Sequence, residues 1–152
     1  MAELLKESII RIKIQSKQNI FIFKVPERYE EDTFLNSLAD MISKNPSVII
    51  IDGYLVKDFE FAKLCNKIKL LAAEFDCTFL IKGRADIALA VDADGVLSDN
   101  NTLSPHQMRH MLSKNSLIGF LIDNKTDKIP TDTDFNISTS NIDNNIQKAK
   151  LI

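Results

Sequence analysis

Residues 78–103, TFLIKGRADIALAVDADGVLSDNNTL, decide the fold of this chain. The stretch begins with a short apolar run at 78–81 that ends at Lys82, a pattern typical of a strand buried on both faces. A helical pattern follows from Arg84, and residues 93–97 turn the chain back into a second short strand. This order predicts a βαβ unit with two parallel strands and a right-handed crossover.

The rest of the chain repeats this alternation of strand and helix. Further strands are predicted at residues 19–25, 48–51 and 117–122, and further helices at 33–43, 58–75 and 105–112. Residues 2–16 fit both a helix and a strand, and we prefer the helix. Beyond the last of these strands the sequence is polar and predicts a loop at 123–133, a weak strand at 135–139 and a terminal helix at 143–151.

Composition limits the classes of protein to which the chain can belong. With 152 residues, 45% hydrophobic and 26% charged, it predicts one soluble α/β domain over residues 1–152. A formal charge of -2 and a pI near 5.7 argue against a nucleic-acid partner. No apolar run reaches the length of a membrane span, about 18 residues, and no signal-peptide pattern begins the chain. We therefore expect a cytoplasmic protein with no membrane partner.

Cysteine and histidine do not predict a metal site in this sequence. Cys65 and Cys77 lie in apolar surroundings at a spacing that fits neither a metal site nor a disulfide scaffold, so we expect buried free thiols. His106 and His110 are four residues apart on one predicted helix, a spacing that can chelate a metal, but no third ligand stands beside them in the sequence. We expect a solvated helix face there.

Three aspartates, Asp92, Asp94 and Asp99, are dense enough to suggest a cation site. However, Asp94 precedes the second strand of the βαβ unit and Asp99 follows it. They are therefore expected at opposite ends of the sheet and do not converge.

The central stretch also fits a longer motif. The residues that fit it are Arg84, Asp86, Ala88, Ala90, Ala93, Asp94, Gly95, Val96 and Leu103. In this pattern the stretch resembles thiamine-phosphate synthase and its thiazole-tautomerase relatives, whose segment has the form I-N-D-R-x-D-x-A-x-A-x-x-A-D-G-V-H-L-G-Q-x-D-L. The resemblance extends over residues 19 to about 122, and residues 123–152 diverge.

The resemblance implies a (β/α) barrel, but the chain is too short for a complete one. Eight strand–helix pairs need at least about 200 residues. We therefore predict a shortened, incomplete TIM-type barrel of five to six parallel strands. The alternative is an open, doubly wound flavodoxin-like sheet, which the alternation alone would favour.

For function, the resemblance implies an enzyme that ionises a hydroxymethylpyrimidine pyrophosphate on magnesium and joins it to a thiazole phosphate. At the family positions for pyrimidine and pyrophosphate contacts this chain has Asp52 and Tyr54. The two metal-binding aspartates are replaced by Gly83 and Thr102. Other family positions for polar side chains hold Lys82, Asn100 and Leu121.

Phosphate binding is also unsupported, because the glycine-containing loops of barrel phosphate sites follow the last strands and no glycine lies beyond Gly119. We predict that the metal and phosphate ligands of the synthase are missing. No cofactor is predicted, and magnesium is expected only if synthase activity is retained.

Polar residues nevertheless gather after predicted strand ends, where barrel and open-sheet sites both form. The candidate ligand-binding residues are Lys82, Arg84, Ser98, Asp99, Asn100, Asp52 and Tyr54. We favour an ordinary polar rim over a ligand site at this place. Arg84 opens a helix, where its charge opposes the macrodipole, so an acidic partner such as Asp86 or Asp52, or a bound anion, is expected.

Three functions follow from these observations. The first is a synthase-like protein without synthase activity that binds a small phosphorylated ligand through Lys82 and Arg84. The second is an assembly module that acts through open sheet edges, and the third is an active synthase with substitute ligands. Because the first strand would be an apolar open edge, a homodimer is predicted, with a cover by the terminal segment as the alternative.

Overall fold

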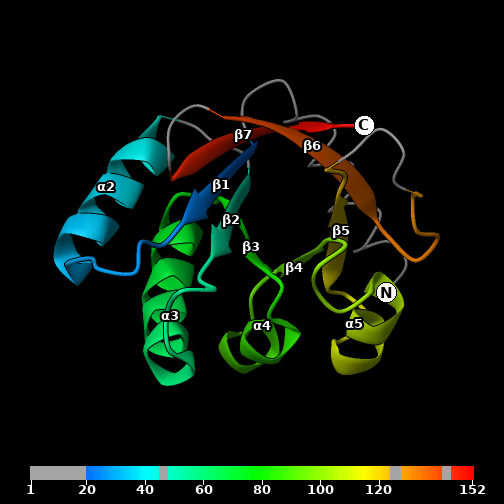
Figure 1. Ribbon diagram of the computed structural model, residues 1–152. Coiled ribbons are helices and arrows are strands. Elements are labelled where there is room, and N and C mark those ends of the chain that lie inside the picture. The colour runs from blue at the N-terminus through cyan, green and yellow to red at the C-terminus, as the bar shows by residue number, and fades with distance from the viewer. Residues whose placement is uncertain (1–19, 45–47, 124–127, 142–144) are drawn as a thin grey trace.

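The computed structural model describes residues 20–44, 48–123, 128–141 and 145–152 (Figure 1). Its elements are β1 (Ile20–Lys24), α2 (Glu31–Ser43), β2 (Val48–Asp52), α3 (Asp58–Glu74), β3 (Thr78–Lys82), α4 (Ala85–Val91), β4 (Gly95–Ser98), α5 (Pro105–Met111), β5 (Leu117–Leu121), β6 (Phe135–Asn141) and β7 (Ile146–Leu151). The helix predicted at 2–16 lies outside the described residues. Within them, no helix combines the length and apolar character needed to span a membrane.

The described strands form a closed barrel in sequence order. β1 to β6 run parallel to one another, while β7 runs antiparallel to both β6 and β1. A shortened TIM-type barrel with six parallel strands is thereby confirmed for the described part of the chain, and the open doubly wound sheet is wrong.

The barrel is closed by the segment for which a terminal helix was predicted, and that prediction is wrong. In β7, Ala149 pairs with Ile20 of β1, and Leu151 pairs with Ile137 of β6. The apolar spacing of Ile146 and Ala149 suits a helix, but a short helix is marginal on its own. Two neighbouring strands that lack partners offer this segment backbone hydrogen bonds on both sides.

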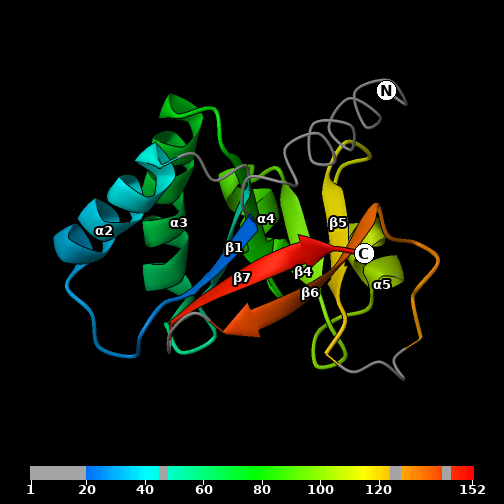
Figure 2. The same ribbon diagram turned by 90° about the horizontal axis from the view of Figure 1, so that it is seen from above.

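Closure of the barrel removes the reason for predicting a homodimer, which was an unpaired apolar edge on the first strand. Figure 2 shows β7 lying between β1 and β6, so the apolar edge of β1 has a partner within the chain. The expected open edges are therefore wrong, and the alternative cover by the terminal segment is confirmed, although as a strand. The homodimer stays a prediction without this support.

The strand residues alternate between two apolar layers, as a period of two requires. Inside the barrel lies a cluster that includes Ile22, Ile50 and Leu80. Their chain neighbours, such as Ile49 and Ile51, face the second cluster, which joins the barrel to the helices. In Figure 1, helices α2 to α5 lie on one side of the barrel and β6 and β7 cross the other.

Candidate functional site

The carboxyl ends of β2, β3 and β4 surround a cavity of about 360 Å³. The residues that line it are Asp52, Tyr54, Lys82, Gly83, Arg84, Asp99, Asn101 and Thr102. Parallel strands bring their carboxyl ends to one edge of the sheet, which is why residues so far apart in sequence meet here.

Lys82 joins two of the other residues that line this cavity. Its Nζ lies 3.5 Å from Oδ2 of Asp52 and 3.3 Å from Oδ2 of Asp99. The side chains are poorly accessible to water, with 21% of Lys82, 13% of Asp52 and 5% of Asp99 exposed. Burial alone would lower the pKa of Lys82, but the two carboxylates outweigh burial, and the net shift of this pKa is upward. Lys82 is therefore a fixed ammonium held between two strand ends.

Each carboxylate uses its other oxygen to hold its own loop. Oδ1 of Asp52 accepts a hydrogen bond from the backbone N–H of Tyr54 at 3.3 Å, and Oδ1 of Asp99 accepts one from that of Asn101 at 2.8 Å. The loops after β2 and β4 are thus connected to β3 through Lys82. This arrangement stabilises the rim, and it also leaves few free acceptors on either carboxylate.

Arg84 lies beside Lys82 and immediately precedes α4. Its guanidinium donates to both carboxylate oxygens of Asp86, at 3.1 and 2.8 Å, and to Asp58 at 2.7 Å. The hydrogen bonds from Arg84 lower the pKa of Asp86, and those same bonds raise the pKa of Arg84. The predicted acidic partner Asp86 is confirmed, whereas Asp52 pairs with Lys82 instead.

Five of the seven candidate residues line the cavity, and two do not. Ser98 is fully buried, and its hydroxyl donates to the backbone oxygen of Leu103 at 2.7 Å. Asn100 is exposed beyond the end of β4 and is not part of the lining. Ser98 therefore holds the loop after β4 in place, and its neighbour Asp99 supplies the side chain at the cavity.

Three lining residues, Gly83, Asn101 and Thr102, were missed as candidates. Gly83 has a φ of +75°, and a Cβ at this position would lie 2.9 Å from Cγ2 of Thr102. The two positions where the family resemblance places metal-binding aspartates are therefore neighbours in space. That correspondence was the signal in the sequence that marked them as part of the site.

The cavity does not fit a magnesium site. Mg²⁺ requires carboxylate and other oxygen ligands in nearly octahedral geometry. Here the ammonium of Lys82 lies between the two carboxylates, and neither Gly83 nor Thr102 carries a carboxylate. Throughout the described ranges, no three His, Cys, Asp or Glu side chains are grouped so that they could hold a metal ion.

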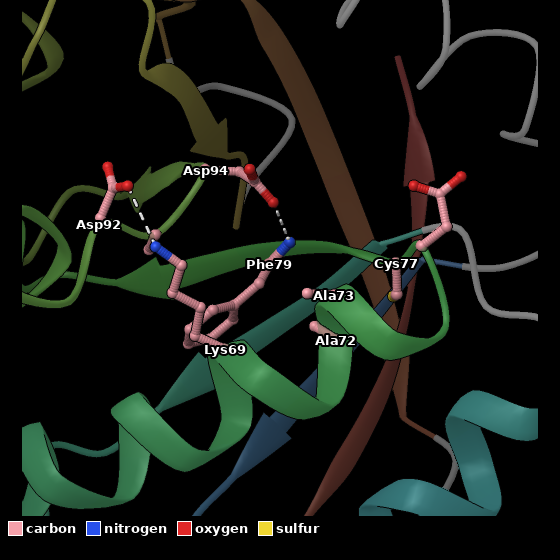
Figure 3. Close-up of a pocket in the computed structure, with 9 residues that line it drawn as sticks. Lys69, Ala72, Ala73, Cys77, Phe79, Asp92 and Asp94 are labelled. Atoms are coloured by element: carbon pink, nitrogen blue, oxygen red, sulfur yellow. Dashed lines mark hydrogen bonds and ion pairs between the residues drawn. The ribbon is translucent and has the colours of Figure 1, made fainter.

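A second hollow lies at the opposite, amino-terminal end of the strands (Figure 3). Asp94 precedes β4 and accepts a hydrogen bond from the backbone N–H of Phe79 at 2.8 Å, while Asp92 pairs with Lys69 at 3.1 Å. Asp99 follows β4 and lines the other cavity, so the prediction that Asp94 and Asp99 lie at opposite ends of the sheet is confirmed.

A family model described as thiamine monophosphate synthase matches residues 21–130, more than half of the chain. The chain belongs to this family. The match includes every residue that lines the cavity, and β6 and β7 lie beyond it.

Two relatives in the family are each more than twice as long as the segment that they share with this chain. Thiamine-phosphate synthase from Alkaliphilus oremlandii is 34% identical over 86 residues, which are 57% of this chain and 41% of the relative. Thiamine-phosphate synthase from Campylobacter jejuni is 37% identical over 89 residues, 59% of this chain and 42% of the relative. The chain therefore spans less than half the length of these two relatives.

A solved structure has the same fold. Thiamine phosphate pyrophosphorylase from Pyrococcus furiosus superposes with a TM-score of 0.60 at 21% identity, covering 72% of this chain and 52% of that one. The likeness at this identity concerns the fold alone.

The family motif residues in this chain mainly hold the scaffold. Asp94 ties the start of β4 to β3, and a Cβ on Gly95 would overlap the backbone oxygen of Leu117. Arg84 and Asp86 pair with each other at the start of α4. The residues that carry the family resemblance thus build the βαβ unit, and of them only Arg84 also lines the cavity.

Proposed function

We propose that this chain is a thiamine-phosphate synthase-like protein that binds a small ligand in the cavity and does not carry out the synthase reaction. The observation that carries the proposal is the position of Lys82 between Asp52 and Asp99. An ammonium lies where the carboxylates would otherwise be available to a divalent cation. Gly83 and Thr102 support the proposal, because they stand at the family positions of the metal ligands.

The charges around the cavity limit the charge of the ligand that it can bind. Within the lining, Lys82 is paired with Asp52 and Asp99. Arg84 is paired with Asp58 and Asp86, which lie outside the lining. A pyrophosphate would need these cations to be released from their partners. We propose a ligand that is neutral or carries a single charge. The small phosphorylated ligand predicted from the sequence is the alternative.

Tyr54 adds a surface on which a flat ligand can stack. Its side chain lines the cavity and is 66% exposed, and Nζ of Lys24 lies 4.7 Å from the centroid of its ring. Aromatic rings of this kind bind planar ligands by stacking and apolar contact. A hydroxymethylpyrimidine without its pyrophosphate is therefore a suitable probe.

The first experiment asks whether synthase turnover exists. The purified full chain is incubated with the pyrimidine pyrophosphate, the thiazole phosphate and magnesium, and thiamine phosphate is quantified by fluorescence. We expect no product above the blank, while the relative from Campylobacter jejuni, assayed in parallel, makes it. Magnesium-dependent product that disappears in Lys82→Met would contradict the proposal and favour an active synthase with substitute ligands.

The second experiment asks whether the cavity binds the probe. Hydroxymethylpyrimidine and its pyrophosphate are titrated separately while amide signals are followed by NMR. We expect the unphosphorylated probe to shift Tyr54 and Thr102, and Tyr54→Ala to weaken this binding, with Phe59→Ala as the control because Phe59 is exposed elsewhere. Stronger binding of the pyrophosphate would overturn the charge argument.

An assembly module is the less supported alternative. It was proposed from open sheet edges, and the described strands form a closed barrel.

A further inference from the structure

Helix α5 carries both histidines of the chain, His106 and His110. Their Nε2 atoms are 3.3 Å apart, and the rings meet edge to face with centroids separated by 4.8 Å. A capping box between Ser104 and Gln107 fixes the first turn of the helix, which places His106. Two imidazole nitrogens therefore face each other across one turn of a helix with a defined start.

A third residue orients this pair from a distant part of the sequence. Oδ2 of Asp132, in the connection between β5 and β6, lies 2.9 Å from Nδ1 of His106. An ionised carboxylate only accepts hydrogen bonds, so Nδ1 is the donor, and in the neutral ring this tautomer leaves the lone pair on Nε2 of His106. That lone pair is available on the side where His110 lies.

The geometry matches a chelate for a transition metal. Metal–nitrogen bonds of about 2.0–2.1 Å at a tetrahedral angle place two ligating nitrogens about 3.3 Å apart. Metal-binding histidines also commonly donate their other ring N–H to a carboxylate, as His106 does to Asp132. The sequence showed neither the distance between the two nitrogens nor the contact with Asp132, because Asp132 is far from the histidines along the chain.

We propose that His106 and His110 form a two-histidine site for a late first-row transition-metal dication, with Asp132 as a positioning residue. The side chain of His106 is 70% exposed, so water fills the other coordination positions. Imidazole ligands favour Cu²⁺, Ni²⁺ and Zn²⁺ over Mg²⁺, and the expected order of affinity is Cu²⁺ above Ni²⁺ and Zn²⁺. The site is separate from the cavity at the carboxyl ends of β2, β3 and β4, and it does not depend on the proposed function.

The competing explanation is a direct hydrogen bond between the rings, in which His110 donates from Nε2 to His106. The N–N distance alone allows this arrangement as well. The two explanations differ in metal binding: a hydrogen-bonded pair without chelation shows no dependence of metal affinity on both rings.

The test uses the full chain without a histidine tag. Cu²⁺, Ni²⁺, Zn²⁺ and Mg²⁺ are titrated by calorimetry at pH 7.5, and Cu²⁺ binding is followed by electron paramagnetic resonance for nitrogen coupling. We expect one Ni²⁺ or Cu²⁺ per chain, at least about tenfold weaker binding in His106→Gln or His110→Gln, and about tenfold or more weaker binding in Asp132→Asn. Asp40→Asn is the matched control, because it removes the same charge at an exposed site on α2.

Two results would overturn the proposal. One is the absence of binding by Cu²⁺ and Ni²⁺ at micromolar concentration, with circular dichroism showing a folded protein. The other is unchanged binding in the double variant His106→Gln/His110→Gln, which has no histidine and would place the metal on other groups such as the thiols.

Discussion

One lysine at the end of β3 connects the two carboxylates that line the cavity. The ammonium of Lys82 forms ion pairs with Asp52 and Asp99, which end or follow the neighbouring strands β2 and β4. Because Asp52 and Asp99 contact the same ammonium, the positive charge is shared between two strands and is not available in full to a bound anion.

Replacement of Lys82 by methionine should destabilise the protein. The change leaves two poorly exposed carboxylates facing each other without their shared cation, and we expect a loss of about 1–3 kcal/mol in the free energy of unfolding. Urea denaturation at pH 7 measures the loss. Lys44→Met is the control, because the Lys44–Asp40 pair is largely exposed and surface pairs contribute about 0–1 kcal/mol.

If the variant Asp52→Asn/Lys82→Met is no more stable than Lys82→Met alone, repulsion between the carboxylates is not the reason for the loss. We expect the asparagine to recover part of the stability, since it removes one of the two charges.

Arg84→Ala should destabilise the protein in a pH-dependent manner. The hydrogen bonds from Arg84 lower the pKa of Asp86 in the folded state. A carboxyl with a lowered pKa stabilises the fold above its unfolded value, about 3.9, and this contribution is lost as pH falls through the folded value. The difference between wild type and variant should therefore be full near pH 6 and shrink below about pH 4.

Thermal melts of both proteins across this range measure the effect. A difference that stays constant from neutral to acid pH would show that Arg84 acts through packing and not through Asp86.

The sequence indicated where these residues lie better than it indicated their partners. Residues after parallel strands share one edge, so Asp52, Lys82 and Asp99 could be placed together from their positions alone. Arg84 pairs with Asp58 because α3 packs beside α4. No local sequence pattern determines this packing. The orientation of Ser98 into the interior likewise follows from the loop that it binds.

At the scale of elements, two aspartates that each precede a strand make the same pair of hydrogen bonds to the neighbouring strand. The backbone N–H of Asp94 donates to the oxygen of Phe79 at 2.9 Å, and its carboxylate accepts from the N–H of Phe79 at 2.8 Å. Asp134 makes the same two bonds with Ile118, at 2.7 and 2.8 Å. Each aspartate thus sets the start of a strand against its parallel neighbour.

Gly95→Ala should be much more harmful than Gly119→Ala. At Gly95 a methyl group would overlap the backbone oxygen of Leu117, which belongs to the adjacent strand β5 and cannot rotate away. At Gly119 it would meet the ring of Phe135, a side chain that can move. We expect a loss above about 3 kcal/mol for Gly95→Ala and about 1–3 kcal/mol for Gly119→Ala.

Chemical denaturation of the two variants side by side tests this order. Equal losses would mean that the strands β4 and β5 can separate as readily as the Phe135 ring can turn.

The regular alternation of strand and helix was predictable up to β5, because each element there has its own apolar period and its own stop signal. The apolar residues of β7 are sparse, and its burial depends on pairing with β1 and β6. A segment whose structure comes from tertiary hydrogen bonds carries a weak local signal, which is why a helix was predicted in its place.

At the scale of the whole molecule, stability depends on the pairing of β1 with β7, which closes the barrel. Ala149→Asp should open this contact, since Ala149 is 5% exposed and lies opposite Ile20. A buried carboxylate without a partner is expected to destabilise the protein by about 2–4 kcal/mol and to increase self-association through the freed edge of β1. Lys150→Asp, at an exposed position of the same strand, is the control.

Light scattering over about a hundredfold dilution reports the self-association of each variant. An Ala149→Asp variant that matches wild type in both mass and stability would show that β7 is dispensable for closure. The same measurement on wild type tests the predicted homodimer.

Closure by the final strand also sets the order of events during synthesis. One edge of β1 pairs with β2 early, but its other edge pairs with residues 146–149 of β7, so this apolar edge stays unpaired for most of translation. During that interval the β7 strand of a neighbouring chain can take the vacant place with the same hydrogen bonds. Conditions that crowd nascent chains should therefore yield strand-exchanged dimers from a sequence whose finished fold has a partner for every described strand.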